Sequence, residues 1–176
     1  MIDLTKKALP NTIMVGGKAF SIYTDFRIWL KFEIECSKLK KGETIDVSYL
    51  FKNEMPASVS IQELKAFSNP VSILPRQVDS NEEIMLDFEL DADLIFSAFW
   101  GQYGIDLTEV DLHWYKFLAL LSGINDSTKL REVMGYRAYD KNQKGDQYEK
   151  MKRIWRIERN FEDDPEEAER FESLFK

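Results

Sequence analysis

Residues 11–23 read NTIMVGGKAFSIY, and this stretch decides the fold of the N-terminal part of the chain. Apolar residues recur at every second position on both sides of the pair Gly16-Gly17. They are Ile13 and Val15 before the pair and Phe20 and Ile22 after it. Two adjacent glycines between alternating runs are typical of a tight turn, because glycine tolerates positive φ. The stretch therefore predicts an N-terminal β-hairpin.

A helix is expected directly after the hairpin. Thr24 or Asp25 can cap its N-terminus, and apolar residues then recur at spacings of three and four. They are Phe26, Trp29, Leu30, Phe32, Ile34 and Cys36. Two lysines and a glycine at residues 40–42 predict its end, since lysine suits the negative end of the helix dipole and glycine suits a left-handed cap.

The rest of the chain predicts further helices. The expected ranges are residues 44–52, 60–67 with Ser60 and Glu63 in capping-box spacing, 91–104 opened by Asp91, 111–123 opened by Asp111, 128–139 interrupted at Gly135, 145–160, and a last helix after Pro165. Residues 69–79 contain two prolines and predict an ordered crossing loop. We therefore expect a mainly α (α+β) fold, with a short N-terminal β-hairpin packed on a multi-helix core. A boundary at residues 140–145 divides this core domain (1–143) from a charged helical extension (144–176).

The composition excludes several kinds of chemistry. The 176 residues include one cysteine (Cys36) and one histidine (His113), and they carry a net charge of −7. One cysteine cannot form a disulfide within the chain, and no cysteine–histidine zinc set can be assembled. No nucleophile motif accompanies His113, and the acidic balance argues against nucleic acid as the main partner. We therefore predict no catalytic, cofactor-binding or metal-binding residues.

Residues 77–115 contain no lysine or arginine and ten acidic residues. These are Asp79, Glu82, Glu83, Asp87, Glu89, Asp91, Asp93, Asp106, Glu109 and Asp111. One interpretation is an acidic surface that faces a basic partner. The other is local, because carboxylates are favoured at helix N-termini, and Asp91, Asp93 and Asp111 fit that account. A divalent cation site is a weaker third reading, because no calcium-loop pattern is present.

Two groups of apolar residues are candidate partner-binding residues. Phe96, Phe99, Trp100 and Tyr103 lie on one helix face, which favours core packing for most of them, but Trp100 is large and such residues are rarely fully buried. Near the C-terminus, Phe171, Leu174 and Phe175 have the spacing of a helix that binds in a groove. A basic segment at residues 149–159 precedes an acidic one at 162–172. Such charges predict docking of the two segments onto each other or onto another subunit, and a frayed end is the alternative.

The chain shows no sign of export or membrane insertion. Its N-terminus lacks the apolar core of a secretory signal, and its longest apolar stretch without charge has 12 residues, at 94–105. A bilayer-spanning helix needs roughly 20 such residues. We expect a soluble cytoplasmic protein that does not bind membranes.

Four separated blocks resemble one protein family. They are NTIMVGGKAFSIYTDFRIWLKFE at residues 11–33, DADLIFSAFWGQYGIDL at 91–107, HWYKFLALLSGI at 113–124 and LREVMGYRAYD at 130–140. In this order they resemble the small bacteriophage proteins usually called gene product fifteen, from long-tailed phages and prophages of Gram-positive bacteria. The pairing of YGIDL with HWYKF is the most distinctive part.

This resemblance implies a non-enzymatic tail assembly chaperone in the host bacterial cytoplasm. Its expected partners are the tape-measure and tail tube proteins, and the oligomeric state, including a homo-oligomer, stays open. A structural subunit retained in the mature tail, such as a connector or completion protein, is the alternative. The matching positions imply fold-defining contacts rather than catalysis; they include Asp93, Tyr103, Asp106, His113, Trp114 and Arg137. A pairing of Arg137 with an acid such as Asp106 is one such expectation.

Overall fold

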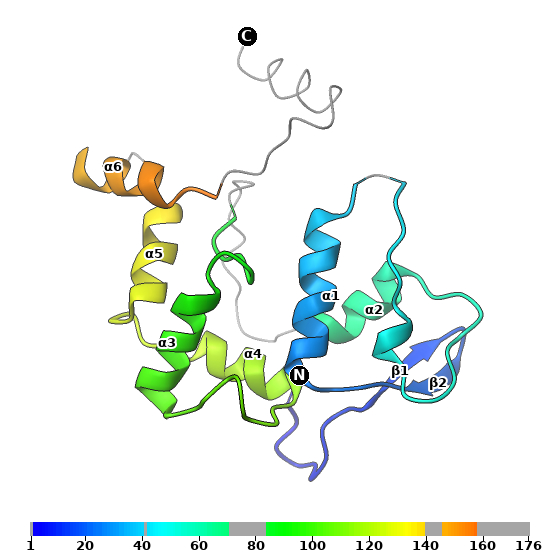
Figure 1. The fold of residues 1–176 in the computed structure, drawn as a ribbon. Helices are drawn as coiled ribbons and strands as arrows, with labels where there is room; N and C mark the ends of the chain where they lie inside the picture. Colours follow the sequence, from blue (N-terminus) through cyan, green and yellow to red (C-terminus); the bar gives the residue numbers. More distant parts are fainter. Residues whose placement is uncertain (1, 41, 71–83, 140–145, 158–176) are drawn as a thin grey trace. The chain divides into compact units, whose positions relative to one another are not determined.

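The protein is described by a computed structural model that covers residues 2–40, 42–70, 84–139 and 146–157. The described residues form six α-helices, one 3-10 helix and a two-stranded antiparallel sheet, which confirms the expected fold class (Figure 1). The chain divides into two compact units, Met1–Glu82 with Leu86–Glu132 and Glu83–Met85 with Val133–Lys176. The boundary expected at residues 143 and 144 lies outside the described residues, and so do most of the loop at 69–79 and the helix after Pro165.

The predicted hairpin is confirmed. Strand β1 (Thr12–Val15) pairs with β2 (Lys18–Ser21) in antiparallel register, with Ile13 opposite Phe20. Gly16 and Gly17 form the turn with φ of 55° and 81°, which side-chain-bearing residues rarely adopt. The alternating apolar side chains point inward, and the segment around Phe51 pairs with the end of β2 through a bridge to Ile22.

Helix α1 (Phe26–Lys38) begins as the sequence predicts and ends earlier. The Asp25 carboxylate accepts a hydrogen bond from the backbone N–H of Arg27 at 2.8 Å, which caps the helix. The helix ends at Lys38 because Leu39 is already extended. The expectation of a left-handed cap at residues 40–42 is therefore wrong, and Gly42, with φ of 90°, lies in a later turn.

The helix expected at residues 44–52 is wrong, and the helix expected at 60–67 is confirmed. Only a 3-10 turn, η1 (Ser48–Leu50), forms in the first range. The Asp46 side chain accepts from the N–H of Ser48 at 2.9 Å, and such local bonds compete with helix formation. Helix α2 (Ile61–Ser68) begins with a complete capping box between Ser60 and Glu63.

Helix α3 (Ala92–Tyr103) confirms its predicted N-cap position, and helix α4 (Trp114–Ser122) does not. Asp91 is the N-cap residue of α3, but its buried carboxylate accepts from the N–H of Asp87 instead of capping the helix. Helix α4 begins at His113 and not at Asp111, because the His113 ring supplies the capping acceptor. The predicted ends hold, since Gly104 caps α3 with φ of 64° and Gly123 follows α4.

The last two helices also depart from their predicted ranges. Helix α5 (Lys129–Arg137) continues through Gly135, so the expected interruption is wrong. A glycine lowers the stability of a helix interior by about 1 kcal/mol but does not end the helix by itself. Helix α6 (Asp146–Trp155) ends before the predicted residue 160, because Arg156 and Ile157 are not helical.

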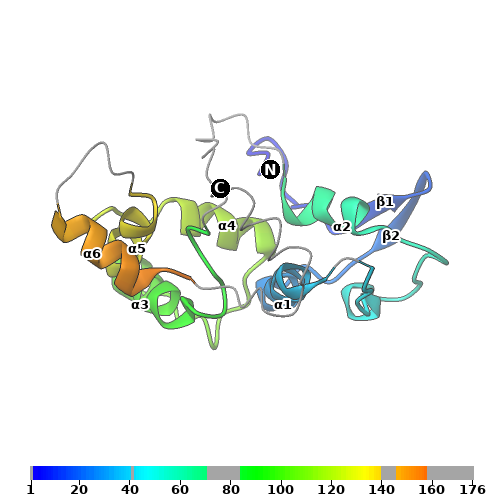
Figure 2. The same ribbon diagram turned by 90° about the horizontal axis from the view of Figure 1, so that it is seen from above.

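The N-terminal ends of α1 and α4 meet and complete each other's hydrogen bonding (Figures 1 and 2). The N–H of Phe26 donates to the carbonyl of Leu112 at 2.9 Å, and the N–H of Trp114 donates to the carbonyl of Thr24 at 2.7 Å. The first N–H groups of a helix have no acceptor within it. The first N–H of each helix therefore donates to the carbonyl of the residue that precedes the N-cap of the other helix. We call this contact the capping junction.

The core of the first unit is an aromatic cluster centred on Phe117 of α4. Figure 2 shows α4 between α1 and α3. The Phe117 ring is stacked on Phe26 of α1 at 4.8 Å between centroids and on Phe99 of α3 at 5.2 Å. Trp114, at 5.6 Å, extends the cluster along α4. One ring therefore joins three helices.

We expect Phe117→Ala to lower the free energy of unfolding by about 3–5 kcal/mol, because it removes a fully buried ring and leaves a cavity. Urea unfolding followed by circular dichroism measures the change. Met55→Ala, at an exposed position, is the control and should change stability by no more than about 0.5 kcal/mol. Equal effects of the two substitutions would contradict the role of Phe117.

Candidate functional site

Helix α3 presents an exposed aromatic side chain on its outer face. Trp100 is 56% exposed, whereas Phe99, beside it in sequence, is fully buried. The half-buried Phe96 ring stacks on Trp100, with centroids 6.4 Å apart and planes 9° apart. In the turn before the helix, Leu90 is 66% exposed. We call Leu90, Asp93, Phe96 and Trp100 the α3 outer face.

Exposed carboxylates occur on this face and in the loop that follows α3. Asp93, in the first turn of α3, is exposed, as are Glu109 and Asp111 in the loop that follows the helix. Glu89 is exposed too, but its carboxylate pairs with Lys38 of α1 at 2.5 Å. Arg27 of α1 contacts the loop that follows α3. Its guanidinium donates to the carbonyls of Leu107 and Val110 and pairs with Asp25. The α3 outer face therefore combines apolar side chains with the carboxylate of Asp93, and further exposed carboxylates follow in the next loop.

Other carboxylates of the lysine-free and arginine-free window bind neighbouring backbone. Asp87 accepts from the N–H groups of Glu89 and Leu90. Asp106 accepts from the N–H and the hydroxyl of Thr108 at 2.8 and 2.6 Å, and these bonds lower the pKa of its carboxyl group. These two carboxylates therefore act locally in turns, and a basic partner for the exposed ones stays a prediction. Asp79, Glu82 and Glu83 lie outside the described residues.

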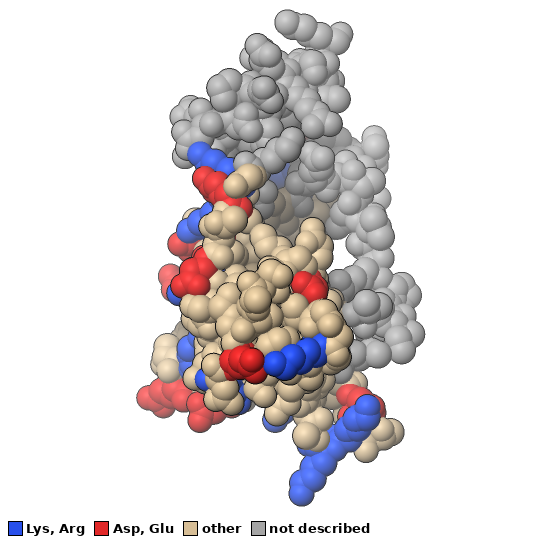
Figure 3. All heavy atoms as spheres, turned by 90° about the vertical axis from the view of Figure 1, so that its right-hand side faces the viewer, with Lys and Arg blue, Asp and Glu red and all other residues tan. Residues whose placement is uncertain are grey.

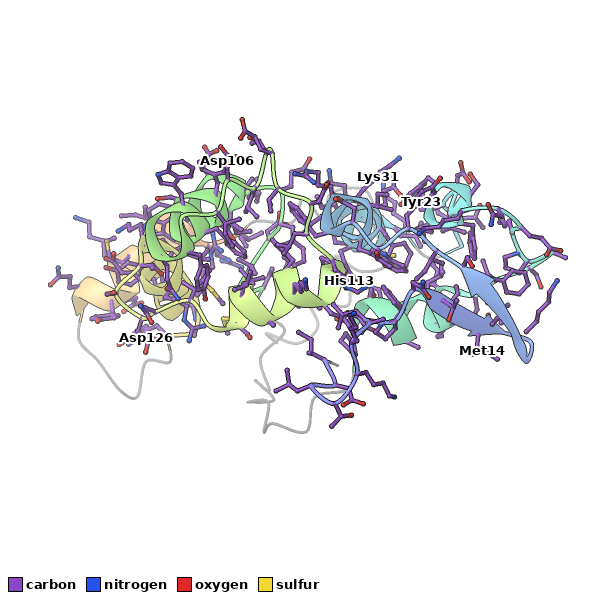
Figure 4. The ribbon with its side chains drawn as sticks, turned by 90° about the horizontal axis from the view of Figure 1, so that it is seen from below. Met14, Tyr23, Lys31, Asp106, His113 and Asp126 are labelled. Atoms are coloured by element: carbon purple, nitrogen blue, oxygen red, sulfur yellow. The ribbon has the colours of Figure 1, made fainter. Side chains whose placement is uncertain are left out.

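His113 serves as a structural cap. Its Nδ1 accepts from the N–H of Tyr115 at 3.0 Å, so the proton of the neutral ring lies on Nε2, which donates to the carbonyl of Pro10 at 2.9 Å. Burial lowers the pKa of the imidazole below its ordinary value, because a charged ring is poorly solvated there. Figure 4 shows His113 at the beginning of α4. Both ring nitrogens are therefore occupied by the fold.

Three further residues implied by the resemblance bind backbone carbonyls. The Trp114 indole N–H donates to Ser68 at 2.8 Å, and the Tyr103 hydroxyl donates to Leu120 at 2.8 Å. In the second unit, the Arg137 guanidinium donates to the carbonyls of Trp155 and Met85 at 2.8 and 3.1 Å. The pairing of Arg137 with Asp106 stays a prediction. These side chains hold loops and helix ends at separate places and do not converge on one site.

Groups that could support chemistry are already engaged or isolated. Within the described ranges, no group of three histidine, cysteine, aspartate or glutamate side chains could hold a metal ion. Cys36 is half-buried, and burial raises the pKa of its thiol. A hollow of about 550 Å³ lies at the end of α1, but its carboxylates are occupied. Glu35 accepts from the Tyr49 hydroxyl, and Glu43 accepts from the N–H of Lys40.

The hairpin end of the first unit is a second surface with exposed apolar side chains. Figure 3 shows that uncharged side chains make up much of the centre of this face, with charged ones mostly around it. Met14, Tyr23 and Met55 are the exposed large apolar residues here. Lys18 forms an ion pair with Glu54 at 3.1 Å, and Lys52 lies 5.8 Å from the Tyr23 ring centre. Charges are thus balanced on this face, unlike the α3 outer face.

The sequence predicts the exposure of Trp100 but not that of its neighbours. The size of Trp100 was the signal that suggested exposure. Leu90 gave no signal, and the helical stripe assigned Phe96 to the core. The candidate residues Phe171, Leu174 and Phe175 lie outside the described residues. No helix in the described part of the chain is both long and apolar enough to span a bilayer.

Comparison with known protein families gives a match over most of the chain. The family model described as Bacteriophage Gp15 protein matches residues 5–160. No curated protein and no solved structure matches the chain.

We expect the free energy of unfolding to fall as the pH drops below about 6.5, the ordinary histidine pKa. Below that pH the unfolded chain binds a proton at His113 before the folded one does, so stability is lost until the lowered folded pKa is reached. In His113→Asn an amide oxygen can still cap α4, and this part of the pH dependence should disappear.

Urea unfolding of both proteins between about pH 7.5 and 5.5 measures the effect. Asp106 provides no competing signal, because its pKa lies below the ordinary 3.8. Parallel stability profiles for the two proteins would contradict the capping role of neutral His113.

Proposed function

Because the chain belongs to the bacteriophage Gp15 protein family, we propose that it is a non-enzymatic phage tail morphogenesis protein. It binds the tape-measure protein, the tail tube protein or both during assembly in the host cytoplasm. The observation that carries the proposal is the α3 outer face, where exposed apolar side chains occur together with exposed carboxylates.

The aromatic part of this face suits reversible protein binding. Large aromatic side chains, tryptophan above all, dominate the energetics of protein interfaces. Trp100 and Phe96 form one stacked unit, and the helix backbone holds that unit in place before a partner arrives. Pre-ordering reduces the entropy that binding costs. Leu90 adds apolar area next to the helix.

The carboxylates on and beside this face determine the charge of the partner segment that can bind. Asp93, Glu109 and Asp111 attract a segment that carries lysine or arginine, and they repel an acidic one. The partner segment that fits is therefore apolar on one side and basic at its edges. A helix with this pattern would cover Trp100 and place its cations beside the carboxylates.

The protein composition of the finished particle distinguishes an assembly chaperone from a structural subunit. A chaperone leaves before the tail is complete, whereas a connector or completion protein stays. Mass spectrometry of purified virions should detect the tube and tape-measure proteins and not this chain. Its presence in stoichiometric amounts would favour a structural subunit instead.

We expect Trp100→Ala to weaken binding to the tape-measure or tube protein by about tenfold or more, the effect of removing an interface hot spot. Co-expression followed by pull-down and titration measures the change. Tyr23→Ala is the matched control, because Tyr23 is also an exposed aromatic residue but lies at the hairpin end. Equal loss in both variants, or no loss in Trp100→Ala, would contradict the assignment of the α3 outer face.

A further inference from the structure

Helix α6 has one face that packs within its own unit. The Tyr148 ring lies 5.5 Å from Tyr136 and 5.7 Å from Tyr139 between centroids. Lys152 donates to the carbonyl of Tyr139 at 2.7 Å, and the carbonyl of Trp155 accepts from Arg137. Positions 148, 152 and 155 lie on one side of a helix. This side is therefore the inner face of α6.

The opposite side of α6 is basic and carries an exposed apolar residue. Lys150 and Arg153 are exposed on it, and Arg156 is exposed just past the end of the helix. Ile154 is 61% exposed. The carboxylate of Glu149 lies 3.5 Å from Arg153, and such a pair on an exposed helix surface stabilises little. We call Lys150, Arg153, Ile154 and Arg156 the α6 outer face.

The chain itself contains a segment of complementary chemistry. Residues 162–172 read EDDPEEAERFE, in which seven carboxylates oppose one arginine. Phe171, within this stretch, and Leu174 and Phe175, just after it, supply apolar side chains. Acidic and apolar groups are thus combined in this segment, as basic groups and Ile154 are combined on the α6 outer face.

The connection between the two is long enough for docking within one chain. Ten helical residues of α6 extend over about 15 Å, at 1.5 Å per residue. The residues between Ile157 and Phe171 can reach more than twice that distance at about 3.3 Å per residue. A short tether also holds the segment at an effective concentration in the millimolar range, which exceeds the usual concentration of a second copy.

We propose that the acidic C-terminal segment, residues 162–175, docks on the α6 outer face of its own chain. Its carboxylates pair with Lys150, Arg153 and Arg156, and its apolar residues cover Ile154. The segment therefore shields the basic face of α6 from acidic partners.

Hydrogen–deuterium exchange of the full chain tests the proposal. The amides of residues 166–175 should exchange about tenfold more slowly than in an unstructured peptide, which corresponds to about 1.4 kcal/mol. Two double variants, Lys150→Glu with Arg153→Glu and Glu166→Lys with Glu169→Lys, should each lose this protection. Their combination restores opposite charges and should regain it.

A matched control keeps the result specific to α6. Lys7→Glu with Lys116→Glu makes the same change in net charge at exposed positions elsewhere and should leave the protection unchanged. Circular dichroism checks that every variant remains folded. Exchange at unstructured rates in the unmodified chain, or no recovery in the combined variant, would overturn the proposal. Protection that rises with protein concentration would overturn docking within one chain in favour of a second copy.

Discussion

The capping junction between α1 and α4 is the constraint on which the first unit depends. Two helix N-termini, almost ninety residues apart along the chain, each lack an acceptor for the first N–H, and each receives one from the other. A buried donor left without a partner costs about 1–3 kcal/mol, more than a formed hydrogen bond contributes net. Neither helix can therefore shift without leaving both termini unsatisfied. This fixes the crossing at which Phe26 and Phe117 stack.

The junction also orders the segments around it. The two capping residues connect the capping junction to further segments. Asp25 orients Arg27, and His113 binds the carbonyl of Pro10. Arg27 then holds the loop between α3 and α4 through two carbonyls. With the loop held and Phe99 packed against Phe117, α3 has one possible inner face. The side that remains carries Trp100, so the exposed surface is a consequence of how the helix starts are joined.

Local signals predicted the elements, and non-local contacts decided their details. The glycine pair, the Asp25 cap and the Ser60 capping box each act within a few residues, which is why the hairpin, α1 and α2 could be read from the sequence. Asp111 is as good a capping residue as His113 in isolation, and only the pairing with residues 24–26 selects His113. In the segment at 44–52 a local bond from Ser48 to Asp46 competes with helix formation, and the bridge of Phe51 to Ile22, far away in sequence, adds a non-local constraint. Exposure of Leu90 and Ile154 depends on packing and has no sequence signal.

The two proposals differ in how much of the sequence they rest on is matched by the family model. The family match covers residues 5–160, which include the α3 outer face and all of α6, whereas the acidic segment at 162–175 lies beyond it. The proposed binding surface therefore lies in the part of the chain that the family model matches, and the proposed docking segment lies outside it. The net charge of −7 conceals this division. The first unit exposes carboxylates beside apolar side chains, which is the basis for proposing a basic partner, and the second exposes the cations that we propose the C-terminal segment to neutralise. Opposite charges on the two units favour association between copies, and docking of the acidic segment, as proposed, would leave the α3 outer face available for a partner.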